Sequence, residues 1–184
     1  MKKNLLIYSS TDGQTKNICN RIQSFSNKEV SSKVIKIENV DSENLENYNK
    51  IIVGASIRYG KHNKEVFKFI KKNKNILKNK KTAFFSVNVV ARKSDKNTPE
   101  TNPYVIKFLK KTNWKPNKTA VFAGKIDYPK YDFFDKHVIR LIMFMTKGPT
   151  DLSKTYEFTD WDAVDKFAKE ISNINDYKGL NNII

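Results

Sequence analysis

The sequence has very little cysteine and no long apolar run. Its 184 residues include a single cysteine, six glycines and five prolines. The lone cysteine, Cys19, cannot form an intramolecular disulfide, which fits a reducing compartment. No apolar stretch reaches the roughly 18–20 residues that a membrane-spanning helix needs, and the first residues lack the features of a secretory signal. We therefore expect a soluble or peripheral protein.

Acidic residues are scarce relative to basic ones. Thirty-five Lys and Arg against nineteen Asp and Glu give a formal net charge of +16. Such a surface attracts phosphates, nucleic acid, acidic lipid headgroups or carboxylate substrates. The lysines are scattered along the chain, so a solvated surface without a specific partner explains them equally well. The sequence has neither a nucleic-acid motif nor a basic stripe interleaved with aromatics, so we expect no nucleic-acid partner.

Short apolar runs alternate with amphipathic patterns along the chain. This order predicts an α/β fold with a parallel sheet, because parallel strands are joined by helices that cover both faces. Five strands fit a flavodoxin-like doubly wound sheet of order 2-1-3-4-5, in which ligands bind beyond the carboxyl ends of the strands. The expected strands are 5–8, 34–37, 51–53, 83–90 and 119–123.

Several local signals refine this outline. Gly54 is expected to close the third strand, Pro103 to lie in the first turn of a helix, and Thr159 or Asp160 to cap the last helix. Cys19 is expected in the core. The chain is expected to form a single domain over residues 1–174, with a basic and apolar insertion after the fifth strand at about 125–154 and a frayed tail over 175–184.

Polar residues fill the turn between the first strand and the first helix. Hydroxyls and free backbone N–H groups at a helix N-terminus bind a phosphate, and Gly13 permits a ligand to approach closely. No Gly-Lys-Ser/Thr follows, so the turn is not a P-loop. Ordinary helix capping is the alternative interpretation. The cofactor-binding residues expected in this turn are Ser9, Ser10, Thr11, Asp12, Gly13, Gln14 and Thr15.

The turn and two later loops resemble a known family. Residues 10–15 are similar to the Ser/Thr-x-Thr-Gly-Asn-Thr loop with which flavodoxins hold the FMN phosphate. Residues 12–15, 54–60, 85–93, 98–102 and 159–161 together resemble the quinone-dependent protoporphyrinogen IX dehydrogenases of the flavodoxin superfamily. Asp12 stands where flavodoxins usually have threonine. Because a carboxylate repels a phosphate dianion, we expect Asp12 to point away or to cap the helix.

This resemblance implies an enzyme of haem biosynthesis. It implies FMN as cofactor, protoporphyrinogen IX as electron donor, and menaquinone or ubiquinone as acceptor. The flavin carries the redox chemistry, so neither a catalytic side chain nor a metal is expected. The flavin ring is expected between the second and third loops, stacked on Tyr59. The further cofactor-binding residues expected there are Ser56, Ile57, Arg58, Tyr59, Gly60, Ser86, Val87, Asn88, Val89, Val90, Ala91 and Arg92.

Cations at the mouth of this expected site suggest how a porphyrinogen is bound. The substrate carries two propionates, and arginine pairs with carboxylates in a bidentate manner. Arg58, Arg92 and Lys93 are therefore expected to bind the substrate, although each has a solvated surface charge as the alternative interpretation. His62, beside a lysine on a loop, is expected to be an ordinary surface residue.

The insertion has two possible roles. It is too short and too charged at its start to span a bilayer, so it either lies in the membrane interface or folds over the flavin as a lid. The resembling family has an insertion here and is associated with the membrane, and a quinone dissolves in lipid. We therefore expect peripheral contact with anionic lipid at the cytoplasmic face of the cell inner membrane. The residues expected to enter the membrane are Phe133, Phe134, Ile139, Ile142, Met143 and Phe144.

Two other functions compete with this enzyme. A flavodoxin that carries electrons between proteins has the same fold, but such carriers are typically acidic and this chain is not. A module that binds nucleic acid or anionic membrane without catalysis would use the positive charge alone. The sequence is also compatible with an oligomer.

Overall fold

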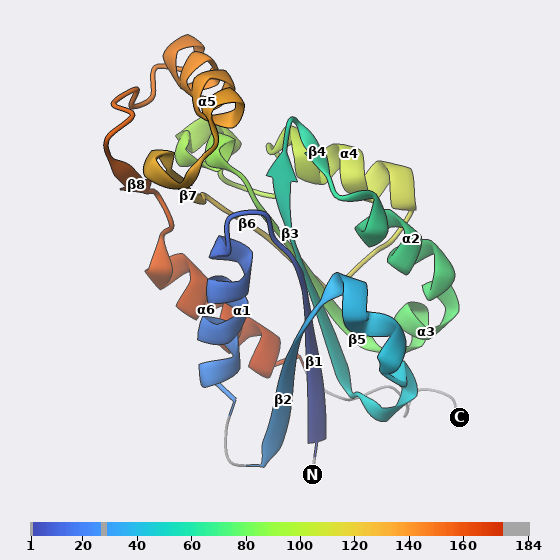
Figure 1. Cartoon of the computed structure of the whole chain (residues 1–184). Helices are drawn as coiled ribbons and strands as arrows, with labels where there is room; N and C mark the ends of the chain where they lie inside the picture. Colours follow the sequence, from blue (N-terminus) through green and yellow to red (C-terminus); the bar gives the residue numbers. More distant parts are fainter. Residues whose placement is uncertain (1, 27–28, 175–184) are drawn as a thin grey trace, which may run out of the picture.

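A parallel sheet of five strands forms the centre of the protein (Figure 1). The computed structural model describes residues 2–26 and 29–174, so the predicted tail lies outside the described residues. The strand order is β2-β1-β3-β5-β6, with every neighbouring pair parallel. This is the predicted order 2-1-3-4-5, and the flavodoxin-like fold is confirmed. The strands are β1 (Lys2–Ser9), β2 (Val30–Lys36), β3 (Lys50–Arg58), β5 (Lys81–Val87) and β6 (Lys118–Phe122).

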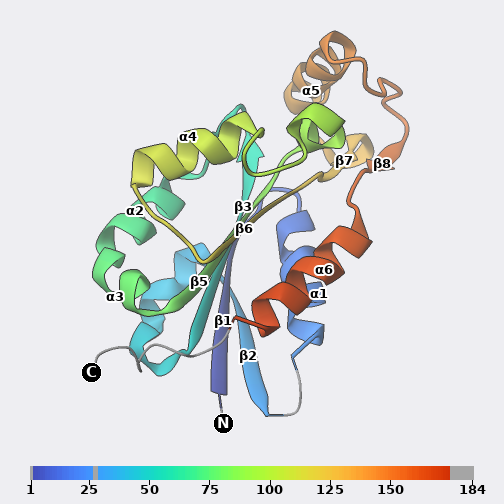
Figure 2. The same cartoon turned by 180° about the vertical axis from the view of Figure 1, so that it is seen from behind.

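Helices cover both faces of the sheet, as Figures 1 and 2 show. One face carries α1 (Gln14–Ser24) and α6 (Trp161–Ser172), which lie side by side. The other face carries α2 (Lys64–Lys72), α3 (Lys74–Asn79) and α4 (Pro103–Thr112). Short 3-10 helices complete the connections: η1 (Ile37–Ser42), η2 (Leu45–Asn47), η3 (Val89–Arg92) and η4 (Ser94–Lys96).

Successive residues of each strand enter different cores, because neighbours along a strand point to opposite faces of the sheet. Leu5 and Ile7 pack into the core beneath α2, α3 and α4, whereas Leu6 packs beneath α1 and α6. Cys19 is fully buried in the second of these cores, as predicted. This burial on both faces explains why the strands read as continuous apolar runs.

The helix caps agree with the local signals. Asn102 accepts hydrogen bonds from the backbone N–H groups of Tyr104 and Val105, and Pro103 begins α4 as predicted. Asp160 caps α6 by accepting from the backbone of Ala163. Of the two predicted caps, the structure therefore uses Asp160.

Gly54 does not close the third strand, so this prediction is wrong. β3 continues to Arg58, and Gly54 lies opposite Phe85 in the sheet. A Cβ on Gly54 would come 2.2 Å from Cζ of the Phe85 ring, so the glycine makes room for that ring. The chain turns back only at Tyr59 (φ 47°) and Gly60 (φ 72°). Positive φ at both residues is typical of a type I′ hairpin turn, and it leads into β4 (Lys61–His62).

Other strand ends also differ from their predicted positions. β2 begins at Val30, and Ile37 already belongs to η1. β5 ends at Val87, and the residues predicted to continue it form η3 instead. The errors at the carboxyl ends of β2 and β5 arise because a short 3-10 helix does not produce a clear periodic pattern.

The insertion begins after β6 and forms a small unit of its own. β7 (Lys125–Asp127) pairs antiparallel with β8 (Thr155–Glu157), and between them lie η5 (Tyr128–Lys130) and α5 (Phe133–Met145). Figures 1 and 2 show α5 beyond the carboxyl ends of the central strands. Ile126, Tyr128 and Met143 bury their side chains in a separate cluster within this unit. The ribbon of two three-residue strands was not predicted from the sequence.

Candidate functional site

A cleft lies where the carboxyl ends of β1, β3 and β5 meet the insertion. Its empty space is about 860 Å³, part of it open to solvent. The three predicted loops contribute Ser10, Asp12, Gln14, Thr15, Ser56, Ile57, Arg58, Tyr59, Gly60, Val87, Asn88, Val89 and Val90. Five further lining residues, from α4 and the insertion, were not predicted as site residues: Tyr104, Gly124, Lys125, Ile126 and Tyr131. Three others belong to α5 and were predicted to enter the membrane instead: Ile139, Ile142 and Met143.

Other predicted site residues lie in the same loops without lining the cleft. They are Ser9, Thr11, Gly13, Ser86, Ala91, Arg92 and Lys93. The backbone oxygen of Ser9 accepts a hydrogen bond from the Ser56 hydroxyl at 3.3 Å, which joins the first loop to the second. Gly13 has a φ of 84°, a conformation that favours glycine. A direct role in cofactor binding for the first six of these residues, and in substrate binding for Arg92 and Lys93, stays a prediction.

The first loop leaves polar groups at the start of α1 without partners. Gly13 is the N-cap and provides no side-chain cap. Within residues 2–26 and 29–174, the buried hydroxyls of Ser10 and Thr15 have no hydrogen-bond partner. The first N–H groups of a helix also lack partners within the helix. Because unpaired buried polar atoms are rare and costly, the loop fits a phosphate group that would accept from all of them.

Asp12 does not cap the helix, so that alternative for it is wrong. Its Oδ2 accepts from the Tyr131 hydroxyl at 3.1 Å and lies 3.4 Å from Nη1 of Arg58. Arg58 also pairs with Asp135 of α5, and the Tyr59 hydroxyl donates to that same carboxylate. We call these five residues the Arg58 cluster. It gives Asp12 two partners, Arg58 and Tyr131, and joins two loops of the cleft to the insertion.

The aromatic members of the Arg58 cluster strengthen it. The Arg58 guanidinium lies 5.3 Å from the ring centre of Tyr59 and 5.2 Å from that of Tyr131, within the range of cation–π attraction. Burial, followed by the charge of Asp12, raises the pKa of Tyr131 to about 12. Tyr131 therefore remains a protonated donor to Asp12 at neutral pH.

The Gln14 side chain is used within the protein. Its Nε2 donates to Glu157 Oε1 and Thr159 Oγ1, both at 2.9 Å, and its Oε1 accepts from Asn17 at 3.2 Å. These bonds join the first loop to the end of the insertion. The Gln14 side chain is therefore already hydrogen-bonded within the protein, and its role in cofactor binding stays a prediction.

A buried chain of polar side chains holds the third loop. Asn88 Oδ1 accepts from the backbone of Ala91 and from Asn102 Nδ2, both at 3.2 Å. Asn88 Nδ2 donates to Ser86 Oγ at 3.2 Å, and Ser86 Oγ lies 3.0 Å from Nε2 of His62. Asn88 lines the cleft. This buried series of hydrogen bonds therefore determines the position of the wall that the third loop gives to the cleft.

His62 is buried, so its prediction as a surface residue is wrong. Its exposed fraction is 7%, and its ring packs against Phe84 and Phe108 with centroid distances of 5.8 and 5.0 Å. The error arises because β4 is a strand, in which Lys61 and His62 point to opposite faces. Burial lowers the pKa of His62 to about 4. The imidazole is therefore neutral at neutral pH.

Arg92 joins the third loop to the end of α5. Its guanidinium donates to Val89 O at 3.1 Å and to Thr146 O and Oγ1 at 2.8 Å. The chain passes so close at Gly148 that a Cβ there would lie 2.9 Å from Arg92 Nη2. Burial lowers the pKa of Arg92. Like Arg58, Arg92 has partners inside the protein, and its contact with substrate stays a prediction.

The predicted membrane residues divide between two faces of α5. Phe133, Phe134 and Phe144 are 80%, 68% and 74% exposed. Met143 is 1% exposed and packs with Ile126 and Tyr128, so its assignment to the membrane is wrong. Ile139 packs against the same cluster, and both Ile139 and Ile142 line the cleft. The helix therefore covers the cleft with one face and exposes phenylalanine on another.

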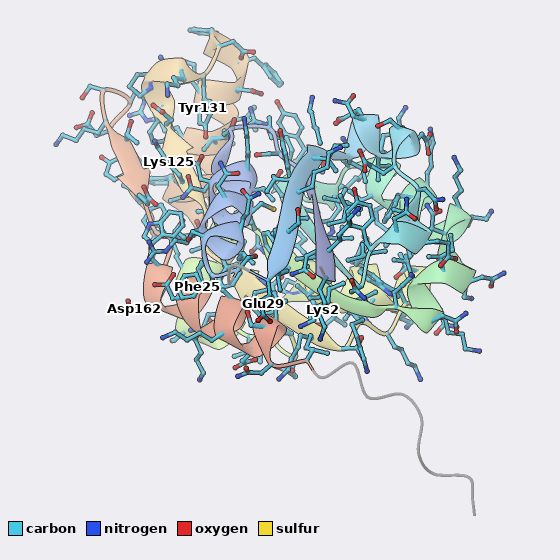
Figure 3. The ribbon with its side chains drawn as sticks, turned by 90° about the horizontal axis from the view of Figure 1, so that it is seen from below. Lys2, Phe25, Glu29, Lys125, Tyr131 and Asp162 are labelled. Carbon is cyan, nitrogen blue, oxygen red and sulfur yellow. The ribbon has the colours of Figure 1, made fainter. Side chains whose placement is uncertain are left out.

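The described part of the chain also has a hollow remote from the cleft. A hollow at the amino ends of β1 and β2 is lined by Lys2, Phe25 and Glu29, well away from Lys125 and Tyr131 of the cleft (Figure 3). Among the residues that the structure describes, none of the helices is both long and apolar enough to cross a bilayer. Within the same residues, no group of three His, Cys, Asp or Glu is placed to hold a metal ion.

Comparison with known proteins places the chain in a family. The model of the flavodoxin domain family matches residues 5–153. Over 175 residues the chain is 40% identical to protoporphyrinogen IX dehydrogenase (quinone) of Escherichia coli, covering 95% of this chain and 97% of that one. The chain belongs to the protoporphyrinogen IX dehydrogenase (quinone) family. The relative of that name in Leishmania major is 43% identical over 172 residues, covering 92% of this chain and 74% of that one.

The predicted resemblance to protoporphyrinogen IX dehydrogenases is thus confirmed. A solved structure supports the fold independently: oxidised flavodoxin 1 from Bacillus cereus superposes with a TM-score of 0.53. It is 18% identical and covers 95% of this chain and 99% of its own. At this identity the likeness concerns the fold alone.

Proposed function

We propose that this protein oxidises protoporphyrinogen IX to protoporphyrin IX with FMN as cofactor and a respiratory quinone as electron acceptor. The observation that carries the proposal is the match to a protoporphyrinogen IX dehydrogenase (quinone) over 95% of the chain. The cleft at the carboxyl ends of the strands supports it, because this is where a doubly wound sheet binds its ligand. When bound, FMN supplies the redox chemistry.

The described residues suit the parts of FMN. The unpaired hydroxyls of Ser10 and Thr15, with the backbone N–H groups at the start of α1, would hold the phosphate. The loops at 56–60 and 87–90 would flank the flavin ring. Tyr59 stands at the edge of the cleft with 54% of its surface exposed, and it would stack on the ring.

The remaining residues of the cleft control its environment. Ile57, Val89, Ile139 and Ile142 give it apolar walls that exclude water from the flavin. Neutral His62, through Ser86 and Asn88, holds the third loop in place.

Conversion of the porphyrinogen to the porphyrin removes six electrons, so three molecules of quinone accept them, two electrons each.

The enzyme assay separates this proposal from that of an electron carrier. FMN-loaded protein receives protoporphyrinogen IX without oxygen, with and without a menaquinone or ubiquinone analogue. We expect porphyrin fluorescence to appear continuously only when quinone is present. Turnover indifferent to quinone would contradict the proposed acceptor. A preparation that takes up no FMN would contradict the cofactor.

We further propose that α5 brings the protein to the cytoplasmic face of the inner membrane. Three exposed phenylalanines lie on a helix that also carries the exposed cation Arg140. Aromatic side chains that insert between headgroups, beside cations that attract anionic lipid, are typical of interfacial helices. A quinone dissolved in the bilayer would then be within reach of the cleft beneath α5.

The triple variant Phe133→Ser, Phe134→Ser and Phe144→Ser should lose this contact. Burying one phenylalanine contributes roughly 1.5–3 kcal/mol, so we expect binding to phosphatidylglycerol vesicles to fall by at least about a hundredfold. Sedimentation with vesicles measures it. Ile106→Ser, at a position 47% exposed on α4, is the control and should bind as the wild type does. A triple variant that still sediments with vesicles, while retaining FMN, would exclude α5 as the contact.

A further inference from the structure

A second groove adjoins the cleft at the β3–β4 hairpin. It lies among β4, α2 and α4, and Figure 1 shows α5 across the hairpin from these elements. Ile57, Gly60 and Tyr104 line both the cleft and the groove. The two spaces therefore adjoin along these three residues, which a ligand held in both would cross.

Four lysines surround the groove. Lys61 comes from β4, Lys64 from the start of α2, and Lys107 and Lys111 from α4. All four are exposed, and none of the described residues that line the groove is acidic. Lys107 and Lys111 are four residues apart and so lie on the same face of their helix. The groove therefore has an uncompensated positive rim.

The floor of the groove is aromatic. The rings of Phe67 and Phe108 lie with centroids 5.0 Å apart, and Lys111 Nζ lies 4.9 Å from the centre of the Phe67 ring. Tyr104 extends this surface to the cleft. An apolar floor with ammonium groups around it suits an amphiphilic anion with a large ring system and carboxylates at one side.

The arginines expected to bind carboxylates are less available. Arg58 already pairs with Asp12 and Asp135, and Arg92 donates to backbone and hydroxyl oxygens of the third loop and the insertion. A substrate carboxylate on either arginine would have to displace these internal partners. The four lysines of the groove make no ion pair within the described residues, 2–26 and 29–174.

We propose that this groove binds the two carboxylates of the porphyrinogen, with Lys61, Lys64, Lys107 and Lys111 as their partners. The proposal rests on the function proposed above and adds the site that orients its substrate. The macrocycle crosses Ile57, Gly60 and Tyr104 to reach the cleft. The same positive rim steers a dianion towards the cleft from solution.

The test replaces all four lysines by glutamine. Its matched control replaces Lys74, Lys78, Lys81 and Lys115, which line a different lysine-rich groove, so that both variants lose the same charge. Each FMN-loaded protein is titrated with protoporphyrin IX, a stable dicarboxylate, and with its dimethyl ester, both followed by fluorescence. KM and kcat for protoporphyrinogen IX are then measured on the same preparations.

We expect the groove variant to bind protoporphyrin IX at least tenfold more weakly and the control variant to bind it normally. A single exposed ion pair contributes little, but two carboxylates with several lysines together reach a tenfold change, which corresponds to about 1.4 kcal/mol. The dimethyl ester should bind both variants equally, because it carries no charge. KM should rise by a similar factor with kcat little changed.

Two outcomes would overturn the proposal. The first is equal affinity for protoporphyrin IX in the groove variant and the control; a loss in Arg92→Ala instead would assign the carboxylates to Arg92. The second is a groove variant that no longer binds phosphatidylglycerol vesicles but still binds protoporphyrin IX with the wild-type affinity. This result would make the groove a lipid-binding site. A wild type that binds protoporphyrin IX through these lysines but oxidises no protoporphyrinogen would support the groove and refute the enzyme.

Discussion

Replacing Ser10 by alanine together with Thr15 by valine should weaken FMN binding by about a hundredfold or more. Hydrogen bonds to a charged group contribute about 1.5–3 kcal/mol each, and a phosphate would receive one from each hydroxyl. The apoprotein should not be destabilised, because both buried hydroxyls lack a partner within the described residues. Removing an unpaired buried polar atom removes its desolvation cost. Quenching of FMN fluorescence and the apoprotein Tm measure the two effects.

A control pair should give the opposite pattern. The hydroxyls of Thr112 and Ser172 donate to backbone oxygens at 2.9 and 3.0 Å, far from the first loop. Thr112→Val with Ser172→Ala should lower the stability of the apoprotein by about 1 kcal/mol per bond and leave FMN affinity unchanged. If the Ser10 and Thr15 variant behaves like this control pair, the phosphate binds elsewhere.

The first loop could be predicted because its signals are local. A strand, a polar turn with Gly13 and an amphipathic helix follow one another within a short stretch, and the fold places such a junction at the ligand. Ser10 and Thr15, which the sequence predicted to bind the cofactor, have hydroxyls with no partner among the described residues. The use of the Gln14 side chain could not be predicted, because its partners Glu157 and Thr159 are distant in the chain.

The Arg58 cluster shows what local signals cannot provide. Asp12 looked unfavourable beside a phosphate because its partners come from the second loop and from the insertion. The sequence contains no sign that Tyr131 and Asp135 lie against Arg58, since only the β7–β8 ribbon places them there. The sequence likewise did not show that α5 buries Met143 within the insertion while it exposes Phe133, Phe134 and Phe144, so the membrane role of the helix stays a proposal.

The predictions for Gly54 and His62 were wrong because glycine and histidine each occur in two different structural settings. A glycine marks either a turn or the close approach of another group, and only the Phe85 ring across the sheet decides for Gly54. A histidine beside a lysine is usually exposed. In the hairpin after β3, however, His62 points into the protein, where it contacts Ser86 beneath the third loop.

The burial of His62 has a consequence for stability at acidic pH. In the unfolded chain the pKa of histidine is about 6.5, whereas burial lowers that of His62 to about 4. Between these values the unfolded state binds more protons, so stability falls as pH falls from about 6.5 to about 4 and is fully present above this window. The difference between the two pKa values corresponds to about 3 kcal/mol.

His62→Gln should therefore flatten the pH dependence of the unfolding free energy, whatever it does to stability at neutral pH. Denaturant unfolding at several pH values between 4 and 7 measures the slope. His137→Gln removes the other histidine, an exposed one on α5, and should keep the wild-type slope. The comparison cancels the carboxylates, which titrate in both variants. Equal slopes in the two variants would mean that His62 does not cause the acid sensitivity.

The same protonation should loosen the wall of the cleft before the protein unfolds. A charged His62 is costly in its aromatic surroundings, and its contact with Ser86 is the first link of the chain that reaches Asn88. The backbone N–H of Ala91 donates to Asn88 at the end of this chain, so its hydrogen exchange reports the position of the third loop. We expect protection of Ala91 to fall as the pH falls from about 6.5 to about 4 in the wild type and in His137→Gln, after correction for the intrinsic exchange rate. In His62→Gln the protection should be independent of pH, because an amide has no proton to gain there. Protection that falls equally in all three proteins would separate His62 from the third loop.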